Sequence, residues 1–155
     1  CAFLLRDDIE TIHAATDLLA EAKLSPELRN EALYYRAKAY TKQKADKKAV
    51  DDLRELAKDT RNAYGAEAKY LVAQSLYDAK EYNAAEKELL NYIEQSTPHA
   101  YWLARSFVLL SDVYAAMGKE LDARQYLLSL QQNYQGNDDI ATMIESRLSK
   151  LKVKN

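Results

Sequence analysis

The stretch EAKYLVAQSLYDAKEYNAAEKELLNY, residues 67–92, decides the fold of this chain. It places Ala73 three residues before a large side chain, Leu76, and twelve residues before a second alanine, Ala85. The same spacing of small, large and small residues occurs 36 residues earlier and 38 residues later, in the sets Ala37, Tyr40, Ala49 and Ser111, Tyr114, Ala123. Self-similarity at this period is typical of helical solenoids, whose units bury their apolar faces only by stacking. We therefore predict three copies of one helical hairpin.

The composition favours an all-α protein. Only three glycines and two prolines occur among 155 residues, which leaves little turn chemistry for β-hairpins. Alanine, leucine, glutamate, lysine and arginine dominate, and these are strong helix formers. Apolar residues make up 48% of the chain, enough for one continuous core if the hairpins stack.

Charge and cysteine content limit the classes of partner and site. With 22 basic and 24 acidic residues and a pI near 5.8, the chain lacks the basic excess typical of proteins that bind nucleic acid or anionic membranes. No apolar run approaches the roughly 18 residues that span a membrane. The single cysteine, Cys1, excludes internal disulfides and thiolate zinc clusters. We expect no nucleic-acid partner, no direct membrane span, no metal and no cofactor.

The first six residues resemble the end of a buried helix. Phe3, Leu4 and Leu5 follow almost directly on Cys1, so we expect a C-terminal fragment of a longer protein. A lipid-modified N-terminal cysteine is the alternative, although such a cysteine normally leads into a polar linker.

Capping signals place the helix boundaries. Ser25 and Pro26 suit the N-cap and first position of a helix, and Thr97-Pro98 predicts a similar start. Gly118 suits a left-handed helix exit. Lys44 and Lys80 stand at the equivalent turns, where a left-handed non-glycine residue costs roughly 1 kcal/mol, so we expect less sharp turns there. The expected helices include residues 9–23, 26–43, 47–58, 63–79 and 97–117.

These elements divide a single domain, 1–155, into repeating units. The predicted units are a partial repeat at 1–25, repeats at 26–61, 62–97 and 98–135, and a capping helix at 137–152 with Ile140, Ile144, Leu148 and Leu151 on its apolar side. Two helices approach to about 8 Å only where the side chains at their crossing are small. The small residues that recur twelve apart therefore predict the crossing points of each hairpin.

The 67–92 stretch resembles the tetratricopeptide repeat (TPR). That pattern has a small residue, a tyrosine three or four positions on, a turn, a tyrosine, and then alanine; Ala73, Tyr77, Tyr82 and Ala85 take these places. The resemblance covers about residues 30–135, although the units are 36 and 38 residues long. It implies a right-handed helical-hairpin solenoid of about three full repeats, with a leading half-repeat and a C-terminal capping helix. The tyrosine- and alanine-rich style is similar to TPR arrays of bacterial cell-envelope proteins and favours a periplasmic or envelope location.

In this family the first helices of successive repeats line a concave groove that holds a peptide or a partner helix. The resemblance carries this face over to Glu31, Tyr34, Lys38, Thr41, Glu67, Tyr70, Gln74, Tyr77, Arg105, Val108 and Asp112. Tyrosines are frequent at recognition surfaces because they offer a rigid contact area and a polar tip. Packing between neighbouring helices is the alternative role for these aromatic side chains.

Some family members clamp the C-terminal carboxylate of chaperones with lysines, asparagines and an arginine. Here Tyr34 stands at a clamp-lysine position and Lys38 at an asparagine position, so we do not expect this activity. Lys38 and Arg105 keep attraction of an acidic peptide open as an alternative.

Two other clusters stand out along the chain. His99, Tyr101 and Trp102 form an aromatic patch that either stacks on a ligand or plugs the junction between repeats. A second cluster surrounds one turn and mixes Lys42, Lys44, Lys47 and Lys48 with Asp46, Asp51 and Asp52. The alternating charges favour a solvated surface over an RNA site.

Catalysis is not expected. The two histidines, His13 and His99, lie far apart in a linear array, and no phosphate-binding glycine loop, metal-ligand spacing or nucleophile motif occurs. The leading hypothesis is a protein-interaction scaffold that binds a peptide or helix, or docks its host protein into an assembly. A peptide-responsive regulatory domain and a structural spacer are the alternatives.

Overall fold

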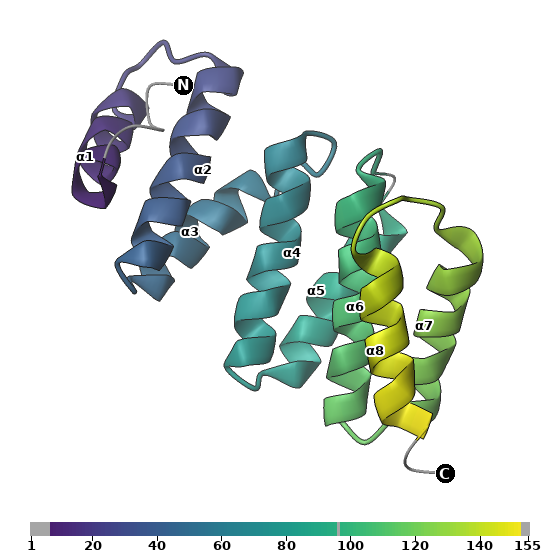
Figure 1. The fold of residues 1–155 in the computed structure, drawn as a ribbon. Coiled ribbons are helices and arrows are strands. Elements are labelled where there is room, and N and C mark those ends of the chain that lie inside the picture. The colour runs from purple at the N-terminus through teal and green to yellow at the C-terminus, as the bar shows by residue number, and fades with distance from the viewer. Residues whose placement is uncertain (1–6, 96, 153–155) are drawn as a thin grey trace. The chain divides into compact units, whose positions relative to one another are not determined.

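The computed structural model describes residues 7–95 and 97–152. This part of the chain contains eight α-helices and no strand, so the all-α prediction is confirmed. The helices, labelled in Figure 1, are α1 (Asp8–Leu19), α2 (Pro26–Lys42), α3 (Asp46–Leu56), α4 (Ala63–Asp78), α5 (Tyr82–Glu94), α6 (Ala100–Ala116), α7 (Glu120–Asn133) and α8 (Ile140–Lys152). The prediction for residues 1–6 lies outside the described residues.

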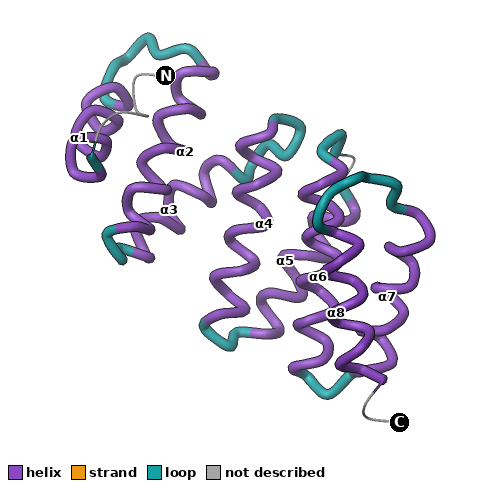
Figure 2. Tube along the Cα trace, in the orientation of Figure 1, coloured by secondary structure: helices purple, strands orange, loops and turns teal. Residues whose placement is uncertain are grey.

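The chain divides into two compact units, Cys1–Val72 and Ala73–Asn155, with the boundary inside α4. In the first unit, α2 packs against both α1 and α3. In the second unit, α6 packs against α5, α7 and α8, and α8 also packs against α7. Short turns join α2 to α3 and α6 to α7 (Figure 2).

The predicted start of α2 is confirmed by its cap. The Ser25 hydroxyl accepts a hydrogen bond from the Leu28 backbone N–H at 3.3 Å, and Pro26 takes the first helical position. Helix α1 has a similar cap, since the Asp7 carboxylate accepts from the Glu10 N–H at 2.8 Å.

The predicted extension of α1 to residue 23 is wrong: the helix ends at Leu19, and residues 21–23 are exposed. These residues bury no surface that would stabilise a further turn.

The predicted start of the third hairpin at Thr97-Pro98 is also wrong by a few residues. Helix α6 begins at Ala100, and His99 is its N-cap without a side-chain bond. The Thr97 hydroxyl accepts from the His99 N–H at 3.3 Å, and the Ala100 N–H donates to the Pro98 carbonyl at 3.2 Å. Thr97 therefore closes a tight turn ahead of the helix, whereas Ser25 caps its helix directly.

The three hairpins leave their first helices by the same backbone geometry. Lys44, Lys80 and Gly118 all have a positive φ, at 59°, 62° and 78°. The next residue in each turn donates its N–H five residues back, in the pairs Ala45 to Tyr40 (2.9 Å), Glu81 to Leu76 (2.9 Å) and Lys119 to Tyr114 (2.8 Å). These bonds define a Schellman exit, which satisfies carbonyl groups that a helix end leaves unpaired. The expectation of less sharp turns at the two lysines is therefore wrong, because the exit keeps its left-handed residue.

The small residues of the recurring pattern are all in the interior. Ala37, Ala49, Ala73, Ala85, Ser111 and Ala123 are each at most 3% exposed. In the third hairpin the Ser111 hydroxyl donates to the Ala123 carbonyl oxygen at 3.0 Å. This bond places residues 111 and 123 at the point where α6 and α7 meet, as the twelve-residue spacing predicts.

Helix α8 covers one side of the last hairpin. Its residues Ile140, Ile144 and Leu148 are buried in a cluster with Leu127 and Leu130 of α7. Residues 141, 142, 145, 146, 149 and 150 on the rest of the helix are exposed. This amphipathic arrangement is the one predicted for the capping helix, which the structure begins at Ile140.

A partly buried ion pair joins the helices of the first unit. Arg36 Nε and Nη2 donate to the Asp52 carboxylate at 2.8 and 2.6 Å, and Arg36 Nη1 donates to the Thr16 hydroxyl at 3.1 Å. Asp52 is 5% exposed, so the prediction that it lies on a solvated, charged surface is wrong. The bidentate geometry compensates for the loss of water around both charges.

Candidate functional site

In the first unit, α2 and α4 bring three of the predicted groove residues together. The Tyr34 hydroxyl donates to the Glu67 carboxylate, at 3.1 Å from Oε1 and 3.2 Å from Oε2. The Lys38 ammonium lies 2.7 Å from Glu67 Oε2 and 5.2 Å from the centroid of the Tyr34 ring. Side chains from successive predicted repeats thus bind one another on this face.

Tyr34 is also the middle member of an aromatic group, which we call the tyrosine cluster: Tyr34, Tyr35 and Tyr64. The Tyr34 ring centroid lies 5.2 Å from that of Tyr35, edge to face, and 4.6 Å from that of Tyr64. Burial, followed by the charge of Glu67, raises the pKa of Tyr34. Burial, Tyr64 and Glu31 raise the pKa of Tyr35. The cluster therefore lies in the field of two carboxylates, Glu31 and Glu67.

Tyr64 is not among the predicted groove residues. Glu67 follows Tyr64 by three residues on α4, so the helical spacing that selects Glu67 also selects Tyr64 as its neighbour. Among the other predicted groove residues of this unit, Thr41 and Tyr70 differ in exposure. Thr41 is exposed and its hydroxyl donates to the Ala37 carbonyl at 2.9 Å, whereas Tyr70 is only 6% exposed.

In the second unit, Tyr77 and Asp112 lie near each other, together with Arg147 of α8. The Arg147 guanidinium donates from Nε and Nη2 to the two Asp112 carboxylate oxygens, both at 3.3 Å. Burial and the Asp112 charge raise the pKa of half-buried Tyr77. Gln74 donates to Asp78 at 2.9 Å, one turn along α4. Arg147 is also absent from the predicted groove face.

Arg105 belongs to the aromatic patch of α6. Its guanidinium carbon lies 5.8 and 5.9 Å from the ring centroids of Tyr101 and Trp102, and its Nη1 donates to the Tyr101 hydroxyl at 2.9 Å. The two rings meet edge to face at 5.1 Å. The Tyr101 hydroxyl donates in turn to Asp139 at 3.0 Å, just before α8. His99, the third residue of the predicted patch, is the N-cap residue of α6.

Val108 is the predicted groove residue with the least exposure to solvent. It is 3% exposed and belongs to the apolar cluster that α8 covers. Its side chain therefore packs in the core of the second unit. The remaining members of the predicted face are polar or aromatic.

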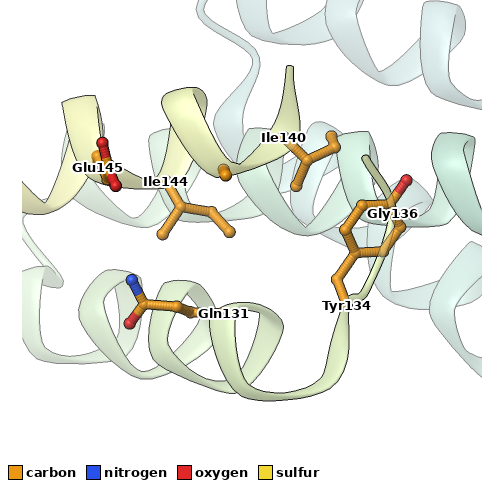
Figure 3. A pocket seen from close by; sticks show the side chains of 7 residues that line it. Gln131, Tyr134, Gly136, Ile140, Ile144 and Glu145 are labelled. Carbon is orange, nitrogen blue, oxygen red and sulfur yellow. The ribbon is translucent and has the colours of Figure 1, made fainter. Parts of the chain in front are cut away.

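Two hollows flank Tyr134 at the end of α7. One, of about 300 Å³, is mainly apolar and lies between α6 and α7, where Leu103, Phe107 and Leu130 line it. The other, of about 70 Å³, lies between α7, the following loop and α8 (Figure 3). In Figure 3 the Tyr134 ring lies against the loop at Gly136, where an added Cβ would meet the tyrosine hydroxyl at 2.3 Å. This position therefore excludes a larger residue unless Tyr134 moves.

Within the described residues, no group of three or more histidine, cysteine, aspartate or glutamate side chains is placed to hold a metal ion. In the same part of the chain, no helix combines the length and apolar character needed to span a membrane.

No protein-family model, curated protein or solved structure compared with the chain matches it. The comparisons therefore provide no relative whose site can be laid over this one.

Proposed function

We propose that this chain is a TPR-like helical-repeat protein that binds a peptide or a partner helix on the face formed by its first helices. The observation that carries the proposal is the threefold recurrence of one hairpin exit, with its left-handed residue and its hydrogen bond five residues back. Three equivalent exits support three equivalent hairpins. In the proposed solenoid, α2, α4 and α6 are the groove-lining helices and α8 is the cap.

The chemistry of these helices supports recognition of a protein partner. Tyr34 and Tyr77 are half-buried, and each combines an aromatic surface with a hydroxyl group. Charged groups of both signs surround them, Lys38 and Glu67 in the first unit and Arg147 and Asp112 in the second. Such mixed aromatic and polar surfaces are typical of protein interfaces.

The same contacts argue against the chaperone-tail type of binding. Lys38 already forms an ion pair with Glu67, and Arg105 donates to Tyr101. An acidic tail would have to compete with both interactions, and breaking an existing pair offsets part of the attraction. We therefore propose a partner other than an acidic chaperone tail.

A structural spacer is the second candidate. The Lys38–Glu67 and Asp112–Arg147 pairs favour it, because each joins two helices within its own unit and so also has a structural role. A spacer needs no partner and should retain its function when the tyrosines of this face are truncated.

A peptide-display selection against the whole chain separates the two candidates. We expect binding peptides whose affinity falls at least tenfold in a Tyr34→Ala, Tyr77→Ala double variant. Tyr126→Ala, which removes a half-buried tyrosine from α7, is the matched control and should retain binding. Circular dichroism verifies that each variant folds. Failure to select any peptide, or equal loss in the control, would contradict the proposal and favour the spacer.

A further inference from the structure

The larger hollow beside Tyr134 is an open site on the third hairpin. Ala104 and Leu130, which are 1% and 6% exposed, form its floor, and exposed residues that include Ala100 and Asn133 form its mouth. Its volume of about 300 Å³ is twice that of an engineered apolar cavity of about 150 Å³ that binds benzene. The hollow therefore has room for a bicyclic aromatic ring, and its mouth lets that ring be attached to a chain outside.

Aromatic side chains form part of the walls. Phe107 of α6 and Tyr134 at the end of α7 both line the hollow, and both pack against the buried cluster that contains Leu130. The Tyr134 hydroxyl donates to Asp138, which is not a lining residue, so Tyr134 contributes its ring to the wall. Contacts between aromatic rings add to the gain from burial, so these walls favour an aromatic occupant.

The lining disfavours a charged occupant. All eight residues that surround the hollow have uncharged side chains. An ammonium, guanidinium or carboxylate group that entered would lose water without gaining a charged partner, which is strongly unfavourable. The hollow therefore suits a neutral and largely apolar group.

One side chain at the mouth offers a hydrogen-bond acceptor. Asn133 Nδ2 donates to the Ser129 carbonyl at 2.8 Å, one turn back on α7. This bond orients the carboxamide and leaves Asn133 Oδ1 to accept from an occupant. An indole ring combines an apolar bicyclic surface with one N–H donor at its edge, and so matches both the walls and this acceptor.

We propose that the hollow between α6 and α7 binds the indole side chain of a tryptophan in a partner protein. The ring lies against Phe107 and Tyr134, and its N–H donates to Asn133 Oδ1 at the mouth. The partner's backbone stays outside the hollow, beyond Ala100 and Asn133.

This site is separate from the proposed peptide-binding face. On α6 the hollow is lined by residues 100, 103, 104 and 107, whereas the predicted face consists of Arg105, Val108 and Asp112. The two sets lie on different sides of the helix, because each repeats at helical spacing from a different starting position. The inference therefore goes beyond the proposed function, and neither depends on the other.

The probe for this site is N-acetyl-L-tryptophanamide, titrated into the whole ¹⁵N-labelled chain and followed by NMR. We expect saturable shifts at the amides of Ala104, Leu130 and Tyr134, with a Kd of about 1 mM for a single buried side chain. The N-acetyl amides of glycine and lysine should cause no such shifts, because one lacks a ring and the other carries a charge. The 1-methyltryptophan derivative should bind about fivefold more weakly, because it keeps the ring but cannot donate to Asn133.

Variants of the hollow give the matched comparison. Ala100→Leu places a larger side chain at the mouth and should weaken binding about tenfold or more, since the ring then lacks room. Ala116→Leu makes the same change at the exposed last position of α6 and should have little effect. Asn133→Ala should weaken binding about fivefold and remove the preference over the methylated derivative, whereas Gln132→Ala, at an exposed position of α7, should do neither. Circular dichroism verifies that each variant folds.

The outcomes separate this inference from the proposed function. No saturable binding below about 10 mM, or binding that Ala100→Leu leaves unchanged, overturns the inference. Equal binding of the methylated derivative also overturns it, because the hollow then does not select an indole N–H. The Tyr34→Ala, Tyr77→Ala double variant should bind the tryptophan amide as the unmodified chain does; loss of binding in that variant would place the ring on the other face and overturn the inference.

Discussion

The Ser111 hydroxyl donates a hydrogen bond to the Ala123 carbonyl oxygen at 3.0 Å and so joins α6 to α7. The other two hairpins have alanine at the position of Ser111, namely Ala37 and Ala73. The third crossing therefore has a polar contact where the others have only small apolar side chains.

Ser111→Ala should lower the free energy of unfolding by about 1 kcal/mol, the usual net value of a hydrogen bond. Ser111→Leu should cost more, because a large side chain overpacks a site that is 1% exposed. Urea denaturation measures both changes. Ser129→Ala, at an exposed position of α7, is the control. A Ser111→Leu variant as stable as the unmodified chain would contradict the proposed crossing.

Lys80→Gly should stabilise the chain by about 1 kcal/mol. Lys80 has a φ of 62°, a conformation that costs a residue with a Cβ about that much and glycine very little. Lys44→Gly should act in the same direction. Chemical denaturation gives the change, and Lys47→Gly within α3 should instead destabilise, as glycine does inside a helix. Destabilisation by Lys80→Gly would show that the lysine side chain compensates for its backbone strain.

Arg36→Leu should destabilise the chain by about 3 kcal/mol or more, because it leaves the Asp52 carboxylate buried without its partner. The double variant Arg36→Leu, Asp52→Leu should recover much of this loss, since no charge remains buried. A double-mutant cycle from denaturation curves measures the coupling. Additive effects of the two substitutions would contradict the assigned pairing.

Tyr134 should ionise later than an ordinary tyrosine. Its hydrogen bond to Asp138 is the largest cause that raises its pKa to about 12. Because the folded-state pKa is above the unfolded value, this contribution to stability is complete below pH 10, the ordinary pKa of tyrosine, and is lost as the pH rises through about 12. NMR titration of the tyrosine ¹³Cζ signals follows the ionisation. Asp138→Asn should move the pKa back toward 10, and Asp139→Asn should move it much less.

Local signals in the sequence were sufficient to predict most of the helices. The Ser25 hydroxyl and Pro26 place the start of α2 because capping depends on neighbouring residues alone. Likewise, the spacing of Ile140, Ile144 and Leu148 identifies the buried side of α8. Errors arose at Thr97, whose hydroxyl closes a turn ahead of α6 instead of capping the helix, and after Leu19, where the exposed residues 21–23 bury no surface that would extend α1.

The paired side chains could not be predicted in the same way. Asp52 reads as a surface charge until α2 brings Arg36 against it, and Tyr64 joins the tyrosine cluster only because α4 packs near Tyr34. The left-handed turns at Lys44 and Lys80 have a similar origin, since the exit hydrogen bonds offset a local preference against them. A contact from another helix outweighs the preference of a single residue at Asp52 and Tyr64, and the hydrogen bonds of the helix end do so at the two lysines.

The proposed binding face lies on the first helices of the hairpins. NMR chemical-shift mapping with a selected peptide tests this proposal most directly on the whole chain. We predict that the largest shifts fall on Tyr34, Tyr64 and Glu67 in the first unit and on Tyr77 and Asp112 in the second. Shifts concentrated instead on the exposed residues of α3, α5 and α7 would contradict the claim.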